Sequence, residues 1–198
     1  MQAGMDSTNQ MLSERGLREI GGLDEYREIF DFPIKEYYRG LGFDFEGEPY
    51  EVLAPLWIEI YNEKSKTSTL VSGIKETIDA IADIGEVKQV VFSATEREML
   101  LRQLSELGIV DKFDEIIGLD NIHAESKLYL AKKWRELHPE ARILYVGDTV
   151  HDAENAKTLD ADCLLFSGGH QSASRLSKCG FPLIEDVREV IRYIKISL

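Results

Sequence analysis

From residue 73 onward, short apolar runs alternate with amphipathic helical patterns, and no other feature constrains the fold as strongly. The predicted strands lie at 88–94, 113–119, 142–148, 161–169 and 181–184. The predicted helices lie at 73–85, 95–109, 126–137, 151–159, 172–180 and 186–196. Because alternating strands and helices are joined by right-handed crossovers, this pattern predicts an α/β fold with a doubly wound parallel sheet.

The first third of the chain shows only helical patterns. Candidate helices lie at 8–17, 23–30, 33–42 and 48–64. In the last of them, one face carries Leu53, Leu56, Trp57, Ile60 and Tyr61. We read that stripe as core packing, and we expect Pro55 to kink the helix or restart it. The polar residues 63–69 read as a linker, so the sequence predicts a helical domain at 1–68 and an α/β core at 69–198.

The composition of the chain limits the classes of partner that we expect for it. The chain has 198 residues and a formal net charge of −13. A surface this acidic repels nucleic-acid phosphates and anionic lipids, so we expect neither as a partner. Two cysteines are too few for a disulfide framework, and no signal peptide or membrane-spanning run is evident, so we expect a cytoplasmic protein. A homodimer is left open.

Candidate functional residues follow the ends of the predicted strands, where doubly wound sheets bind their ligands. Ser93 ends the first core strand, Gly147 and Asp148 end the third, and Lys127 opens the helix after the second. Asp152 follows Asp148 by four residues. We therefore expect these groups to converge on one crevice.

Their chemistry suits a phosphate and a metal ion. A serine hydroxyl, the N–H groups at a helix N-terminus and a lysine bind phosphate oxygens. Two carboxylates four residues apart can reach Mg²⁺ directly or through water. Taken singly, Asp148 reads as a helix cap, Asp152 as a first-turn carboxylate and Lys127 as a surface lysine. Their order and positions together favour the functional interpretation.

Four stretches then carry a resemblance to a known family. "VVFSAT", "AESKLYLAKKW" and "YVGDTVHDAENAK" resemble the second, third and fourth motifs of the haloacid dehalogenase-like superfamily. "DEYREIFDFPIKEYYRGLGFDF" is similar to the helical cap of its phosphoglycolate-phosphatase-like members, and "FSGGHQS" to a stretch after their fifth strand. The resemblance implies that residues 1–68 form the cap on a Rossmann-like core. It also implies phosphate binding by Ser93, Ala94 and Lys127, and Mg²⁺ binding by Asp148 and Asp152.

Four further residues are candidates for substrate contact. Thr95 and Thr149 lie beside the phosphate and metal residues, His151 stands between the two acids, and His170 follows a pair of glycines. Thr95 and Glu98 are also spaced as a capping box for the following helix. For the two histidines, exposed loop positions without a function are the competing interpretation.

The family's first motif is missing from this resemblance. It is a strand that ends in Asp-x-Asp, whose first aspartate attacks phosphorus, and it precedes the cap. Here the cap begins almost at Met1, and the acidic stretch "GFDFEGEP" (Asp44 to Glu46) follows no strand. The resemblance places the missing strand between the strands that end at Ser93 and Asp148. The start at Met1 is therefore expected to be an internal methionine; a fragment and a genuine variant are the alternatives.

The expected function is a Mg²⁺-dependent phosphatase of small phosphorylated metabolites that works through an aspartyl phosphate, inactive in the chain as given. The alternative is a non-catalytic protein that binds phosphate and Mg²⁺. A dehalogenase is less favoured, because carbon–halogen cleavage does not need the acidic metal pair. A response-regulator receiver domain would place its acidic residues before the hydroxyl and the lysine, and it has no helical cap.

Overall fold

A computed structural model describes residues 1–119 and 127–197, with side chains for 1–119 and 129–195. The chain has a mixed α/β fold with parallel strands and divides into two compact units. The first unit comprises Met1–Ser68, Asp148–His151 and Ser167–Leu183, and the second comprises Thr69–Gly147, Asp152–Phe166 and Ile184–Leu198. Two short stretches from the predicted α/β core thus group with the N-terminal helices.

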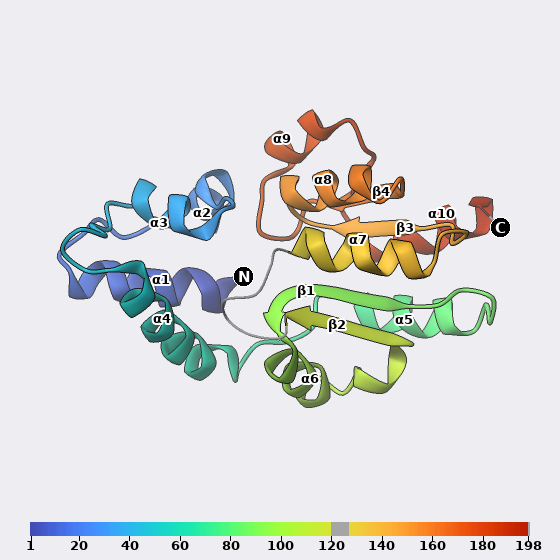
Figure 1. Ribbon diagram of the computed structural model, residues 1–198, viewed down its shortest axis with the longest axis horizontal. Coiled ribbons are helices and arrows are strands. Elements are labelled where there is room, and N and C mark those ends of the chain that lie inside the picture. Colours follow the sequence, from blue (N-terminus) through green and yellow to red (C-terminus); the bar gives the residue numbers. More distant parts are fainter. Residues whose placement is uncertain (120–126, 198) are drawn as a thin grey trace. The chain divides into compact units, whose positions relative to one another are not determined.

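The first unit is helical. Its helices are α1 (Gln2–Glu14), α2 (Leu23–Ile29), α3 (Ile34–Gly40), α4 (Tyr50–Ser65) and α9 (Ala173–Leu176), with the 3₁₀ turn η2 (Ser177–Cys179). Helices α1 and α4 pack against each other (Figure 1). One boundary was wrong, since helix α1 starts six residues before the predicted position 8. Helix α4 does not restart at Pro55, which lies in its second turn, close to the start, where few backbone bonds are lost. A kink of α4 at Pro55 stays a prediction.

The core of the first unit is rich in aromatic rings. Tyr26, Tyr37, Tyr38, Phe30, Phe43, Met11, Leu12 and Leu53 are buried in one cluster. Of the predicted stripe on α4, Leu53 is fully buried and Trp57 packs against the cluster, whereas Leu56 is 40% exposed. The predicted burial of Leu56 is therefore wrong, although its neighbour Trp57 packs against the core.

The second unit carries strands and their connecting helices. The strands are β1 (Val90–Glu96), β2 (Glu115–Leu119), β3 (Leu144–Gly147), β4 (Asp162–Phe166) and β5 (Leu183–Ile184). The helices are α5 (Ile74–Ala82), η1 (Val110–Lys112), α6 (Arg97–Glu106), α7 (Lys127–Leu137), α8 (Val150–Thr158), η3 (Val187–Glu189) and α10 (Val190–Ser197). Helices α6 and α7 both contact β1 and β2, and Figure 1 shows them on opposite faces of that pair, as right-handed crossovers require.

The strands form two sheets, β1–β2 and β3–β4–β5. Pairing is parallel between β1 and β2 and between β3 and β4. Within the part of the chain that the structure describes, no strand pairs with the second edge of β1 or of β3. These are the two strands that carry Ser93 and Gly147, and β1 continues past Ser93 to Glu96, beyond its predicted end. Val146, in the middle of β3, is 44% exposed, although it lies in an apolar run typical of a strand buried on both faces.

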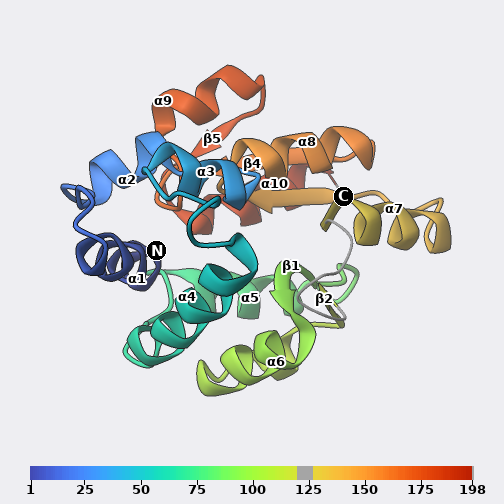
Figure 2. The same cartoon turned by 60° about the vertical axis from the view of Figure 1, so that its left-hand side comes forward.

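Helix α5 packs against both sheets from one side. Ile78 joins Leu100 and Leu104 of α6 in the cluster on β1–β2. Ile81, three residues later, joins Leu164 of β4 and Ile194 of α10 in the cluster on β3–β4–β5. Figure 2 shows α5 running beside β1 and β2. Because positions i and i+3 lie on one face of a helix, this single helix buries apolar surface of both sheets.

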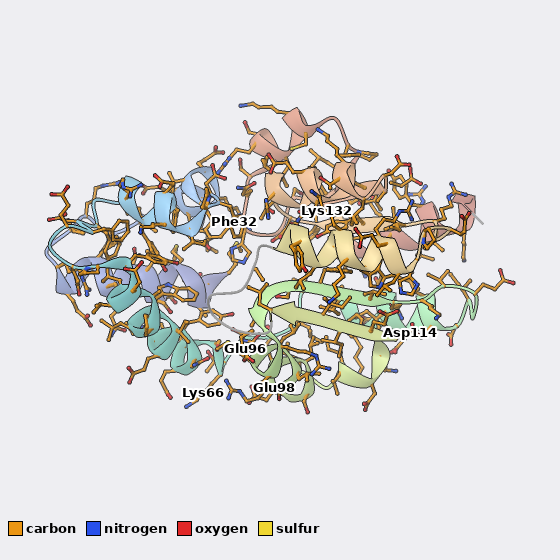
Figure 3. All side chains as sticks on the ribbon, viewed as in Figure 1. Phe32, Lys66, Glu96, Glu98, Asp114 and Lys132 are labelled. Atoms are coloured by element: carbon orange, nitrogen blue, oxygen red, sulfur yellow. The ribbon has the colours of Figure 1, made fainter. Side chains whose placement is uncertain are left out.

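Helix α6 begins differently from the prediction. Strand β1 extends to Glu96, so Thr95 is in the strand and does not cap the helix. Glu96 is the cap, and its carboxylate accepts hydrogen bonds from the backbone N–H groups of Glu98 and Met99 (Figure 3 labels Glu96 and Glu98). These bonds lower the pKa of Glu96. The capping-box spacing of Thr95 and Glu98 was misleading, because the Glu96 carboxylate accepts the bonds of the free N–H groups at the start of α6.

No helix in the described ranges 1–119 and 127–197 is both long enough and apolar enough to cross a bilayer.

The buried tyrosines predict alkaline unfolding of the first unit. Burial raises the pKa of Tyr26, Tyr37 and Tyr38. In the unfolded chain a tyrosine ionises near pH 10, roughly. A folded pKa above the unfolded one means that this contribution to stability is present below the unfolded pKa and is lost as pH rises beyond it. Tyrosinate absorbance from these rings should rise together with loss of the tertiary circular-dichroism signal. Ionisation of all tyrosines while that signal persists would contradict the burial.

Candidate functional site

The predicted site residues lie in both units. Ser93, Ala94, Thr95, Lys127 and Asp152 belong to the second unit, and Asp148, Thr149, His151 and His170 belong to the first. Each group has its own geometry, described in turn below. That all of them converge on one ligand stays a prediction.

The end of β1 departs from regular strand pairing. The register with β2 shifts between Phe92 and Glu96. Ser93 Oγ accepts a hydrogen bond from the Thr95 N–H at 3.1 Å, and Ala94 is exposed. A Cβ on Gly118 of β2 would come within 2.7 Å of the Thr95 carbonyl oxygen, so the bulged turn lies directly against β2. The segment that carries the predicted phosphate-binding hydroxyl is therefore a packed turn.

Lys127 is the first residue of α7, as predicted, but its side chain lies outside the described residues. Its proposed contact with phosphate stays a prediction.

Asp152 occupies the first turn of α8 and is 5% exposed. The Tyr145 hydroxyl donates a hydrogen bond to its Oδ1 at 3.3 Å. Gly147 makes room for it, because a Cβ at Gly147 would stand 2.3 Å from the Asp152 Cβ. The glycine before Asp148 is thus required by the second acid of the pair.

Asn155 follows Asp152 by one turn and was not singled out from the sequence. It is fully buried, and neither its Nδ2 nor its Oδ1 has a hydrogen-bond partner among the described residues. A buried amide without partners costs about 1–3 kcal/mol. No sequence signal indicates this, because asparagine on a helix is ordinarily a surface residue.

Asp148 is enclosed by the chain segment after β4. Its Oδ2 accepts a hydrogen bond from the His170 N–H at 2.8 Å. A Cβ on Gly169 would come 2.0 Å from the same oxygen. The glycine in "FSGGHQS" therefore permits a backbone donor to approach the carboxylate, and this bond fixes the orientation of Asp148.

Both histidines pack on aromatic side chains from the N-terminal helices. His170 Nδ1 lies 2.7 Å from the Tyr26 hydroxyl, and its ring centroid is 4.8 Å from that of Phe30. The His151 ring centroid is 5.3 Å from that of Phe32, which is labelled in Figure 3. Both histidines are partly buried, so the exposure assumed in the alternative is wrong, while a contact of either histidine with substrate stays a prediction. Thr149, between the acids, is 5% exposed.

The alternative acidic stretch has no catalytic setting. Asp44 lies in the turn between α3 and α4, where its Oδ1 accepts the Glu46 N–H at 2.9 Å. It is a turn-forming residue with no strand before it.

The predicted metal ligands Asp148 and Asp152 carry carboxylate oxygens, a donor type that suits Mg²⁺ better than a softer metal. No cluster of three or more His, Cys, Asp or Glu side chains suited to a metal occurs among the described residues. Magnesium binds through one or two protein carboxylates and keeps several waters or substrate phosphate oxygens. Zinc would need three or four nitrogen or sulfur ligands in close array.

A family model described as haloacid dehalogenase-like hydrolase matches residues 1–166. The chain therefore belongs to the haloacid dehalogenase-like hydrolases. No curated protein matches the sequence.

Solved structures agree on the fold. A haloacid dehalogenase-like hydrolase from Streptococcus pneumoniae superposes with a TM-score of 0.80 at 16% identity, over 98% of this chain and 91% of that one. Protein tyrosine kinase A of Mycobacterium tuberculosis gives 0.77 at 21% identity, over 96% and 89%. A predicted phosphoglycolate phosphatase from Haemophilus somnus gives 0.72 at 16% identity, over 100% and 91%. At these identities the likeness concerns the fold.

Gly169→Ala tests the enclosure of Asp148. Its Cβ would stand 2.0 Å from Asp148 Oδ2, so the loop or the carboxylate must move. Overpacking of this kind lowers the free energy of unfolding by about 1–3 kcal/mol. Denaturant unfolding measures the change. Gly40→Ala is the matched control, since a Cβ at Gly40 meets no atom within 4 Å. Equal stability of the two variants would contradict the packing of Gly169 against Asp148.

Proposed function

We propose that the complete protein is a Mg²⁺-dependent phosphatase of small phosphorylated metabolites. The observation that carries the proposal is the acidic segment after β3 in a chain of this hydrolase family, with Asp148 held by the His170 N–H and Asp152 accommodated by Gly147. Neither constraint is needed by a simple helix cap. Both fix carboxylates at the carboxyl end of a parallel strand, where such folds bind ligands.

The proposed roles follow the residue chemistry. Asp148 and Asp152 would hold Mg²⁺, which supplies positive charge to the phosphoryl group and offsets the acidic surroundings. Ser93, Ala94 and Lys127 would bind the phosphate oxygens. The remaining candidates, Thr95, Thr149, His151 and His170, would contact the substrate. The His170 N–H, by binding Asp148 Oδ2, would hold the carboxylate in the orientation in which it meets the metal ion.

The nucleophile is the part that residues 1–198 do not supply. In the proposed reaction, an aspartate attacks phosphorus, the leaving group departs, and water hydrolyses the aspartyl phosphate. The unpaired second edges of β1 and β3 among the described residues support a strand between them as its carrier. We therefore expect this chain alone to bind Mg²⁺ and phosphate without turnover.

The rival function is a non-catalytic protein that binds Mg²⁺ and phosphate. Under this rival hypothesis the same residues bind Mg²⁺ and phosphate, and the protein in the cell has no nucleophilic aspartate. A cytoplasmic location and a lack of nucleic-acid or membrane partners belong to both hypotheses, and the oligomeric state is left open by both.

Turnover of p-nitrophenyl phosphate separates the two. The chain from Met1 with Mg²⁺ should release no more than background product. The same chain extended by the codons that precede Met1 in frame should turn over repeatedly, if they encode an apolar strand ending in Asp-x-Asp. Multiple turnovers by the unextended chain would refute the proposed nucleophile. A stop codon directly upstream, with Mg²⁺ and phosphate binding intact, would favour the rival.

Asp148→Asn in the active, extended chain tests the metal role. Loss of one of two carboxylate ligands should lower kcat/KM more than about a hundredfold, since outer partners of metal ligands alone cost tenfold to a hundredfold. Asp160→Asn, at an exposed position just past α8, is the matched control and should leave kcat/KM unchanged. If excess Mg²⁺ leaves Asp148→Asn as active as the control, Asp148 is not a ligand.

A further inference from the structure

Gln171 joins two segments of the first unit through one buried side chain. It is fully buried. Its Oε1 accepts the Val150 N–H at 2.6 Å, and its own backbone N–H donates to the Asp148 carbonyl oxygen at 3.3 Å. Its Nε2 donates to the Phe30 carbonyl oxygen at 2.9 Å and lies 3.4 Å from Asp31 Oδ1. The acceptor thus binds the segment Asp148–His151, and the donors bind the turn that follows α2.

Neighbouring residues hold the same turn. Arg175 is 19% exposed, donates to the Phe30 carbonyl oxygen at 2.5 Å, and forms an ion pair with Asp31 at 2.9 Å. Arg27 Nε donates to the Gly169 carbonyl oxygen at 3.2 Å, and the Ser172 N–H donates to the Arg27 carbonyl oxygen at 3.2 Å. The side chains of Gln171 and Arg175 thus hold the turn itself, while the bonds of Arg27 attach the adjoining end of α2 to residues 169–172.

The attached turn carries the rings that face the histidines. Phe30 packs on His170 and Phe32 packs on His151, while His170 N–H binds Asp148. Moving the turn would withdraw both rings from the residues that flank Asp148. Keeping it in place preserves an aromatic wall, defined here as Phe30, Phe32, His151 and His170.

We propose that Gln171 is a positioning residue that couples residues 29–33 to the Asp148–His151 segment and so fixes the aromatic wall beside Asp148. The chemistry requires an amide, because a single side chain must accept from Val150 and donate to Phe30. Ionised glutamate keeps the acceptor and loses the donors, so the exchange measurements on this variant are made at a pH where the introduced carboxyl is ionised. Leucine fills the volume and loses both. If the phosphatase proposal holds, the wall that Gln171 fixes contacts the leaving group; this consequence rests on that proposal, whereas the coupling does not.

The competing interpretation makes Gln171 a core-filling residue whose bonds only satisfy its own amide. Under that interpretation, any substitution loosens the surroundings equally. Under our proposal the two segments respond separately, according to which hydrogen-bonding group is lost.

Amide hydrogen exchange, followed residue by residue by NMR on the chain from Met1, makes the distinction. The Val150 N–H reports the Asp148–His151 segment, and the Ser172 N–H reports attachment of the end of α2, directly before the turn, since it donates to Arg27. Gln171→Leu should speed exchange of both amides by about tenfold or more. Gln171→Glu should speed Ser172 by a similar factor and leave Val150 within about threefold of wild type.

Two further variants keep the test decisive. Gln10→Leu, an exposed site in α1 of the same unit, should change neither amide. Arg175→Lys, which keeps the charge and loses the forked donors, should speed Ser172 and spare Val150, and it serves if the Gln171 variants do not fold. Equal acceleration of both amides in Gln171→Glu, or no acceleration in Gln171→Leu, overturns the coupling. Because no substrate or metal enters this measurement, a failure of the phosphatase proposal would not affect it.

In the extended, active chain, Gln171→Glu should raise KM for a bulky phosphomonoester more than for a small one, with kcat little changed. A uniform fall in kcat for both substrates would indicate a structural role only. This kinetic test is informative only if the phosphatase proposal is correct, whereas the hydrogen-exchange experiment does not depend on that proposal.

Discussion

The hydrogen bond from the His170 N–H to Asp148 is the interaction on which the candidate site depends. It exists because Gly169 has no Cβ, so the backbone after β4 can approach the carboxylate directly. Once the backbone is held there, the His170 ring meets Tyr26 and Phe30, and the Gln171 side chain reaches the turn after α2. A charge-assisted bond from a backbone donor is strong, and only the Asp148 side chain has to be ordered to form it. The residues around Asp148 are therefore organised from one short segment.

A second constraint acts on the core. Each sheet has its own parallel pairs, and α5 packs on both through Ile78 and Ile81. Backbone hydrogen bonds hold the paired strands together, whereas burial of apolar side chains holds α5 on the sheets. The two halves of the core can thus share one apolar face without a continuous ladder. This arrangement is compatible with a strand between β1 and β3.

Prediction from the sequence succeeded where the signal is local and repeated. Alternating apolar runs located β1 to β4, and helical periods located most of the helices, because burial of one face imposes those periods. It failed at boundaries where competing groups decide the outcome. Glu96 rather than Thr95 caps α6, α1 starts earlier than its polar residues suggested, and Leu56 lies exposed on an otherwise packed helix. Each of these outcomes depends on which residues lie next to the position in the folded structure, and the hydrophobic period along the sequence does not contain that information.

The sequence by itself determined the family, the types of the site residues and their positions at strand ends, because spacing along the chain sets which end of an element a residue occupies. Only the tertiary structure decided that Gly147 and Gly169 make room for Asp152 and Asp148, and that Gln171 joins two segments more than a hundred residues apart. It also decided that the strands form two sheets. The reason is physical: close approach and hydrogen-bond geometry arise from atoms distant in the chain, and one-dimensional spacing carries no measure of that distance.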